Sequence, residues 1–485
     1  MRKALRLVLV LGALALAIAA VAVLAHRSSS RNALQEYRAE LRAKGEKLTF
    51  QELGPSFSTN GTESTRNFLN AAANLSLSGS SPGIVGVMEY IGPGTARVAW
   101  AEANARLSSV KDDTTTTWAG LAEQVDAAED VLLRIRESLG KPDVDMGWDQ
   151  KDVLSRPRDD FITKRNAAKW LAGAVVTEIH RGRLDEAAKN LHSLAAVTQM
   201  QREELTLANQ FIRIAIGSLG LATTWEALQT NGWSDAQLAR MQDDCESVNF
   251  LAAVEKGFLG ERAHHEAIMA LIRTNKNQKI GPMSSEGSVA EIVVGGILSL
   301  VWQPDEDERF YLQNMQATLD SVRALAAHRP WTEVKAKLDD GKADIDRIGR
   351  SITKYRYLIS LISIPNTTRG VDTALRNETE RQLAIAAIAI KRYQLRQGKA
   401  PPSLLALAPE FLAAVPIDPM SGQPLRYRLN ADGSFVLYSV GEDGRDDGGD
   451  TNPPQPVSQP DLWSGRDAVW PAPAVAAQRS NNLPL

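Results

Sequence analysis

The densest group of side chains with metal-binding chemistry lies near the C-terminus, in the segment 443–450. Asp443, Asp446, Asp447 and Asp450 bring four carboxylates into eight residues, and the glycines between them let the chain curl. Calcium takes about six to eight oxygen ligands from carboxylates and backbone carbonyls. Four like charges on one short loop repel each other unless a cation neutralises them or water solvates them. The segment therefore predicts a Ca²⁺ site with these four aspartates as ligands, and a solvated acidic turn is the alternative.

A second group with metal or acid–base chemistry is Glu261, His264, His265 and Glu266. Carboxylate-bridged di-iron bundles use Glu-x-x-His motifs, but they need two of them, and no second one occurs here. A zinc-protease helix needs His-Glu-x-x-His, and Met269 stands where the second histidine would be. This group therefore indicates an exposed polar helix face rather than a metal centre.

The sequence indicates no residue as a catalytic nucleophile. The one cysteine, Cys245, lies between acidic neighbours, whose charges raise the pKa of a thiol and disfavour the reactive thiolate. No Walker phosphate loop occurs. The sequence does not decide whether the protein is an enzyme, and its residue pattern favours a protein without enzymatic activity.

The composition narrows the class of protein. At 485 residues, the chain is long enough for two to four folded units at roughly 150 residues each. Hydrophobic residues make up 44% of the sequence, which excludes intrinsic disorder for most of it. A net charge of -3 argues against a nucleic-acid partner, because nucleic-acid-binding domains carry a basic excess. A single cysteine excludes an intrachain disulfide framework.

The N-terminal run 4–25 is apolar apart from Arg6 and follows Arg2 and Lys3. About 20 apolar residues suffice to span a bilayer, so we expect a transmembrane signal-anchor at 1–26. A cleaved signal peptide and a buried helix are the alternatives. Either export signal predicts a single-pass or released protein whose bulk is extracytoplasmic (periplasmic), with the cell membrane as a partner. A second apolar run, 292–302, is too short to span and is expected to be buried.

Helices are expected to dominate the middle of the chain. We expect a stalk and an irregular, Gly/Ser/Thr/Asn-rich segment at 27–99, and an α-helical domain at 100–365 built as a hairpin array or bundle. Ser234 and Gln237 form the pattern of a capping box at the start of one helix. The expected helices are 117–139, 161–180, 184–202, 205–230, one beginning after Ser234, 305–328, 331–363 with a break at Gly341, and 367–397.

The C-terminal region changes character after Pro401. The runs 425–429 and 435–440 are rich in aromatic and β-branched residues and flank a turn at 430–433, which predicts a β-hairpin. We expect a small α+β module at 366–450, followed by a proline-rich, extended tail at 451–485. The expected fold class is therefore mainly α, with an N-terminal transmembrane helix and an α+β C-terminal module.

Ordered short motifs in this module resemble the globular domain of the major pseudopilin of type II secretion, over about 375–450. The resemblance is carried by Tyr393, Pro401-Pro402-Ser403-Leu404, Pro416-Ile417-Asp418-Pro419, Tyr427 and Tyr438-Ser439-Val440-Gly441. It implies an α+β fold with calcium bound in the acidic loop, where Asp443 matches the aspartate of the family motif and Asp446, Asp447 and Asp450 lie among its further acidic residues. The pseudopilin leader, with its glutamate near the processed end, is not found at 4–25.

The whole chain also resembles a group of uncharacterised bacterial membrane-anchored helical proteins, through Gly45-Glu46-x-Leu48-Thr49 and Asp467-Ala468-Val469-Trp470-Pro471. That resemblance implies an architecture and no activity. Three functions remain open. The first is a membrane-anchored extracytoplasmic interaction or scaffold protein with a protein partner. The second is an extracytoplasmic hydrolase with a site assembled in the helical domain around Glu261 and His264. The third is an accessory of a type II secretion or pilus-like machine.

Overall fold

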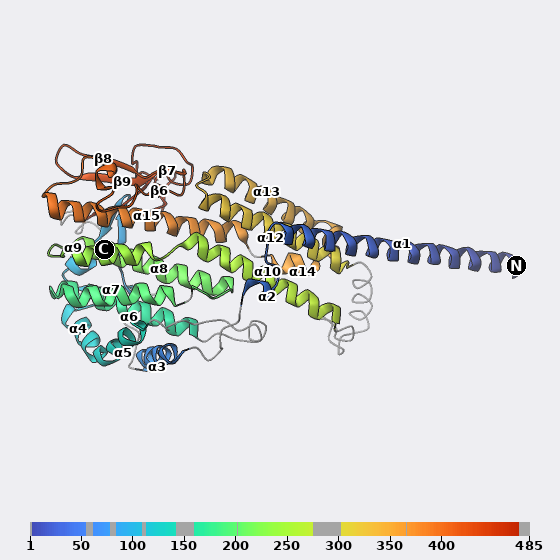
Figure 1. The fold of residues 1–485 in the computed structure, drawn as a ribbon, viewed down its shortest axis with the longest axis horizontal. Coiled ribbons are helices and arrows are strands. Elements are labelled where there is room, and N and C mark those ends of the chain that lie inside the picture. The colour runs from blue at the N-terminus through green and yellow to red at the C-terminus, as the bar shows by residue number, and fades with distance from the viewer. Residues whose placement is uncertain are drawn as a thin grey trace. The chain divides into compact units, whose positions relative to one another are not determined.

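The computed structural model describes residues 2–54, 62–77, 84–108, 113–141, 160–200, 202–274, 302–364 and 366–474, which are mainly helical (Figure 1). They fold into two compact units. Unit 1 consists of Met1–Pro55, Phe258–Asp320 and Leu338–Thr367. Unit 2 consists of Ser56–Gly257, Ser321–Lys337 and Thr368–Leu485. The helices α10 (Phe250–Thr274), α12 (Pro304–Ala326) and α13 (Trp331–Arg350) contribute residues to both units.

The described part of unit 1 consists of helices around the end of α1 (Arg2–Ala43). Leu34 and Leu41 of α1 are buried at a spacing of two helical turns, so one face of the helix packs inward. The short helix α2 (Phe50–Leu53) follows, and Thr49 and Glu52 form a capping box at its start. The unit is completed by η2 (Ile352–Arg356) and α14 (Leu358–Ser363).

The N-terminal apolar run needs a correction. Residues 4–25 are not a separate element but the first part of the continuous 42-residue helix α1, whose second part is rich in charged residues. Most side chains of 1–24 lie outside the described residues. Among the residues that are described, the structure contains no helix with the length and apolar character needed to cross a bilayer. This finding contradicts the expected N-terminal transmembrane helix.

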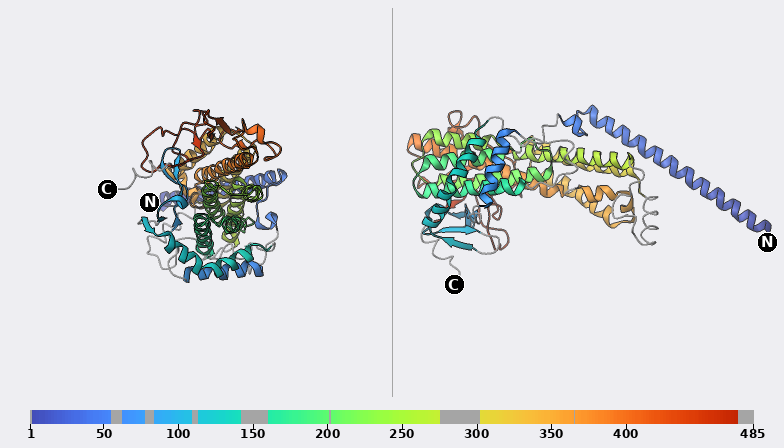
Figure 2. Two further views of the ribbon diagram at one scale, coloured as in Figure 1. Left: turned by 90° about the vertical axis from the view of Figure 1, so that its left-hand side faces the viewer. Right: turned by 90° about the horizontal axis from the view of Figure 1, so that it is seen from below.

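Unit 2 is built on helices that lie side by side (Figures 1 and 2). The helix α6 (Asp160–His180) packs on α7 (Leu184–Gln199) and on α8 (Leu207–Leu228), and α7 packs on α9 (Asp235–Glu246). An apolar core joins α6, α7 and α8 to α5 (Glu129–Leu139) and α3 (Glu63–Leu77). The long helix α15 (Thr367–Gln397) leads into the C-terminal region.

Several helix predictions are confirmed and three are wrong. The capping box of Ser234 and Gln237 starts α9, and α15 has the expected bounds. The expected helix 117–139 is two helices, α4 (Trp118–Ala127) and α5, which meet at Ala128. The expected break at Gly341 lies instead at Ser351, whose side chain caps η2. The helix α3 lies in a stretch that we expected to be irregular. Most of the second apolar run, 292–301, lies outside the described residues.

The described strands of unit 2 form small sheets, in the orders β1-β4-β5, β11-β3-β2, β10-β9-β8 and β6-β7. The predicted hairpin is confirmed as β8 (Arg426–Leu429) and β9 (Phe435–Ser439). Part of the expected tail folds back, because β10 (Ala468–Val469) pairs with β9 and β11 (Ala472–Pro473) pairs with β3 (Thr95–Arg97). The other strands are β1 (Ile84–Val85), β2 (Glu89–Gly92), β4 (Ala105–Ser108), β5 (Asp113–Thr116), β6 (Ile417–Asp418) and β7 (Gln423–Pro424).

Candidate binding site

The loop that follows β9 lines a cavity of about 460 Å³ in unit 2. Its walls come from the stretches 441–447 and 463–468, with Pro454 between them. The charged and aromatic side chains on the wall are Glu442, Asp443, Arg445, Asp447, Trp463 and Arg466. The volume lies within the roughly 300–1,000 Å³ that is usual for small-ligand sites. We call this space the 441–468 cavity.

Asp467 organises the acidic loop from behind. It is almost fully buried, and its carboxylate accepts hydrogen bonds from the backbone N–H groups of Asp447 at 3.4 Å, Gly449 at 2.7 Å and Asp450 at 3.1 Å. Burial raises the pKa of Asp467, and these N–H groups oppose the rise. At the start of the loop, Gly441 has φ +72°, and a Cβ there would lie 2.6 Å from the carbonyl oxygen of Arg466, so only glycine fits.

Asp418, the aspartate of the Pro-Ile-Asp-Pro motif, holds the backbone at the end of β9 through hydrogen bonds, as Asp467 holds the acidic loop. It is fully buried and accepts hydrogen bonds from the Ser439 hydroxyl at 2.7 Å and from the backbone N–H of Val440 at 3.2 Å. It also accepts the N–H of Met420 at 3.0 Å. The motif residue that carries the family resemblance therefore fixes the point where the acidic loop begins.

The structure divides the four predicted calcium ligands into two pairs. Asp446 accepts hydrogen bonds from Arg426 at 2.8 Å and from the Tyr438 hydroxyl at 2.9 Å. Burial acts to raise the pKa of Asp446, but the hydrogen bonds from Arg426 and Tyr438 hold it below its usual value. Asp450 accepts from Asn452 at 2.7 Å and from Arg466 at 3.1 Å, and the N–H groups of Asn452 lower its pKa.

Asp443 and Asp447 are the two that line the cavity. Both are exposed, and within the described residues neither forms a salt bridge. Among the described residues, the hydrogen bond that the Asp443 side chain accepts comes from the backbone N–H of Arg445, at 2.9 Å. No group of three or more His, Cys, Asp or Glu side chains is placed to hold a metal ion in the part of the chain that the structure describes. The calcium site formed by all four aspartates therefore stays a prediction.

One wall of the cavity is backed by a polar network that the sequence did not reveal. The Trp463 Nε1 atom donates to Oε1 of Glu380 on α15 at 3.4 Å, and the Arg376 guanidinium lies 5.4 Å from the Trp463 ring centre. Arg376 also pairs with Glu442. Burial raises the pKa of Glu380 to about 7, while the Trp463 N–H and the Arg376 charge act in the opposite direction. The network holds the tryptophan ring in place and neutralises Glu442.

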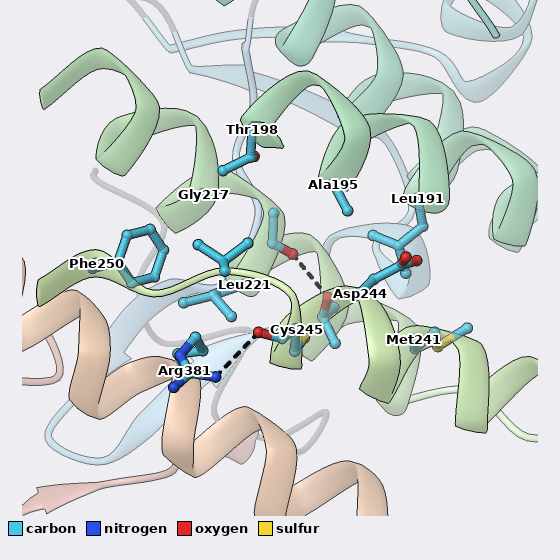
Figure 3. Close-up of a pocket in the computed structure, with 13 residues that line it drawn as sticks. Leu191, Ala195, Thr198, Gly217, Leu221, Met241, Asp244, Cys245, Phe250 and Arg381 are labelled. Carbon is cyan, nitrogen blue, oxygen red and sulfur yellow. Dashed lines mark hydrogen bonds between the residues drawn. The ribbon is translucent and has the colours of Figure 1, made fainter. Parts of the chain in front are cut away.

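A second cavity, of only about 30 Å³, lies between α7, α8 and α9 and is mainly apolar (Figure 3). Cys245 lines it, and the Arg381 side chain donates to the Cys245 carbonyl oxygen at 3.3 Å. Burial raises the pKa of the Cys245 thiol to about 12, so the thiolate is not accessible near neutral pH. The space suffices for about one or two water molecules and not for a substrate.

The group around Glu261 is not the exposed face that we expected. His265 is buried, its ring stacks on Tyr311 with 3.6 Å between ring centres, and burial lowers its pKa to about 4. Glu266 pairs with Arg38 at 2.5 Å. Neither cavity described above is lined by these residues. These contacts pack the group within unit 1.

Comparisons with family models, with curated proteins and with solved structures find no match to this chain. The pseudopilin resemblance of the C-terminal module and the resemblance of the whole chain therefore stay expectations from short motifs.

Proposed function

We propose that the protein is an interaction protein whose C-terminal module binds a basic segment of a protein partner in the 441–468 cavity. The observation that carries the proposal is that Asp443 and Asp447, which form no salt bridge among the described residues, line a cavity of about 460 Å³ together with Trp463. Carboxylates bind guanidinium and ammonium groups through charge-assisted hydrogen bonds. An aromatic ring face attracts the same cations.

The remaining charges of the wall favour a peptide over a simple cation. Glu442 is paired with Arg376, and Arg466 is paired with Asp450. Arg445 is the basic residue of the wall that forms no salt bridge among the described residues. A basic residue within a peptide complements both the negative and the positive charges of the wall. Its side chain faces the aspartates, and its backbone carbonyls accept hydrogen bonds from Arg445.

The test is a melting experiment on the full chain with three added ligands, namely tri-arginine amide, tri-glutamate and calcium chloride. Tri-arginine amide at a hundredfold excess over Kd is expected to stabilise the folded chain by about 2.7 kcal/mol, which corresponds to several degrees in Tm. Tri-glutamate is expected to give no shift. Equal shifts with both peptides, or no shift with either, would overturn the proposal.

A second candidate is a calcium-binding module, and the observation that favours it is that Asp443 and Asp447 share one cavity. Calcium would complete its shell with water and backbone carbonyls. A rise in Tm with millimolar calcium that chelator reverses, together with no response to tri-arginine amide, would favour this candidate over the first.

The proposed location is outside the cytoplasm, because the apolar run 4–25 after Arg2 and Lys3 is typical of an export signal. Protease added to spheroplasts is then expected to degrade the protein before the cells are lysed. An accessory role in type II secretion stays a prediction, and co-purification with a pseudopilin tests it.

A further inference from the structure

Unit 1 exposes a patch that is both apolar and basic, at the segment 347–364. Ile352 and Ile362 have exposed fractions of 84% and 82%, the largest of the big hydrophobic side chains in the described parts of the chain. Tyr355 is also exposed. We call this segment the 347–364 patch. It belongs to η2, α14 and the end of α13, and it takes no part in the 441–468 cavity.

The exposure of these side chains is built into the fold. Asp307 of α12 is fully buried and accepts hydrogen bonds from the backbone N–H groups of Ile359 at 2.9 Å and Ser360 at 3.0 Å. The Ser360 hydroxyl donates to the Asp307 carbonyl at 2.7 Å. Ser360 is thereby held against α12, and Ile362, two residues further along the helix, points to the opposite side. The hydrogen bonds to Asp307 therefore determine which face of α14 is exposed.

The charge of the patch has one sign. The segment 347–364 contains Arg347, Arg350, Lys354 and Arg356 and no aspartate or glutamate. Arg347 pairs with Asp344, and Arg356 pairs with Glu306 at 2.6 Å. Arg350 and Lys354 form no salt bridge among the described residues, and the Lys354 ammonium lies 5.2 Å from the Tyr355 ring centre. Within the described residues, this segment thus combines two cations that form no salt bridge with two exposed isoleucines.

The patch contacts α1 at the residue that follows its apolar run. Arg356 Nη2 donates to Nε2 of His26 at 3.0 Å, directly after the apolar run 4–25. Among the described side chains of that run, the large apolar ones, Leu11, Leu14 and Val21, are also exposed, by 55–65%. Exposed apolar side chains therefore occur both in the patch and on the described part of α1.

We propose that the 347–364 patch rests on an anionic lipid surface. Isoleucines on such a face enter the boundary between headgroups and acyl chains, and long basic side chains reach the lipid phosphates while their stems cover apolar surface. Attraction between basic residues and anionic lipid adds to the binding free energy that the apolar side chains contribute. The proposal is independent of the peptide site in unit 2.

The test places a fluorescent probe on the patch of the full chain. Ile362→Cys is labelled with an environment-sensitive nitrobenzoxadiazole group, and Cys245 is buried and stays unlabelled in the folded protein. Leu405→Cys is the matched control, because Leu405 is a 72% exposed residue of unit 2. With vesicles rich in phosphatidylglycerol, the probe at 362 is expected to shift to the blue, brighten at least about twofold and be quenched by brominated lipid. The probe at 405 is expected to stay unchanged.

A localised probe separates docking of the patch from binding through α1 alone. If the protein sediments with vesicles while the probe at 362 stays unchanged, or if the two probes respond alike, the proposal is wrong.

Arg350→Glu/Lys354→Glu is further expected to weaken binding to anionic vesicles by at least about tenfold. The matched double reversal Arg134→Glu/Lys399→Glu, at exposed residues of unit 2, is expected to change it by less than about threefold. Equal effects of the two double variants would also contradict the proposal.

Discussion

At the scale of single residues, Glu226 of α8 is a fully buried carboxyl group. It accepts backbone N–H groups from Met88 at 2.9 Å and from Ala99 at 3.0 and 3.1 Å. Burial raises its pKa from 4.5 to about 8, and the charges of Glu89 and Glu102 add to the rise while the N–H groups oppose it. The residue ties α8 to the two ends of the segment 88–99, which contains β2 and β3.

The raised pKa of Glu226 predicts a loss of stability with rising pH. The folded state keeps a proton that the unfolded state releases, so the stabilisation is complete below pH 4.5 and is lost as pH rises to about 8. Glu226→Gln cannot ionise, so its unfolding free energy is expected to depend less on pH. Urea unfolding at pH 5 and 8.5 measures both slopes, and identical slopes would refute the prediction.

Asp467 gives a second prediction at this scale. Asp467→Ala leaves three backbone N–H groups of the acidic loop without their acceptor, and each such loss costs about 1–3 kcal/mol when buried. We therefore expect a loss of about 3 kcal/mol in the unfolding free energy. Asp447→Ala is the matched control, because this exposed side chain forms no salt bridge among the described residues, and it is expected to stay within about 0.5 kcal/mol. Equal losses would show that Asp467 does not hold the loop.

At the scale of elements, the cap of α9 is the feature that the sequence predicts most directly. The Ser234 hydroxyl accepts the Gln237 N–H at 3.3 Å, and the Gln237 side chain accepts the Ser234 N–H at 2.9 Å. Ser234→Ala is expected to lower the unfolding free energy by about 1 kcal/mol. Ser403→Ala is a matched control, since Ser403 precedes the short 3₁₀ helix η3 (Leu404–Leu407) and its side chain forms no cap hydrogen bond. Thermal unfolding of the two variants checks the prediction, and equal Tm values would contradict it.

Local patterns predict elements well where the chain marks its own ends. The hairpin β8–β9 was found from its turn residues, and α15 from its periodicity and flanking sequence. The helix α3 was missed because its composition resembles a loop. Phe68, Ala72 and Leu75 are fully buried on one face of it, so packing against α5 and α6 overrides the weak helix propensity of its polar residues.

The candidate site was predicted only in part, because its assembly depends on contacts far apart in sequence. The acidic loop was found from its density of carboxylates. The roles of Asp467, Trp463 and Glu380 could not be predicted, since Trp463 and Glu380 are 83 residues apart and Asp467 reaches back 17 to 20 residues. A buried aspartate between an arginine and an alanine carries no local motif that signals this role.

At the scale of the whole molecule, the returning C-terminal stretch connects distant parts of unit 2. The strand β10 pairs with β9, β11 pairs with β3, and the Trp225 Nε1 atom donates to the Pro471 carbonyl at 2.9 Å. A chain truncated after Arg466 loses both strands and leaves the Trp225 N–H without its acceptor. We expect it to melt at least several degrees lower than a chain truncated after Ala474, which retains these contacts. Equal melting temperatures would contradict this role for 467–474.

The central claim is that Asp443 and Asp447 bind a basic peptide, and calorimetric titration of the full chain with tri-arginine amide tests it most directly. Asp443→Asn/Asp447→Asn keeps the shape of both side chains and removes their charges, so the account predicts an affinity at least about tenfold weaker than wild type, a difference of about 1.4 kcal/mol. Asp243→Asn, at an exposed aspartate of α9, is expected to bind as wild type does. Equal affinities of the double variant and the wild type would contradict the account.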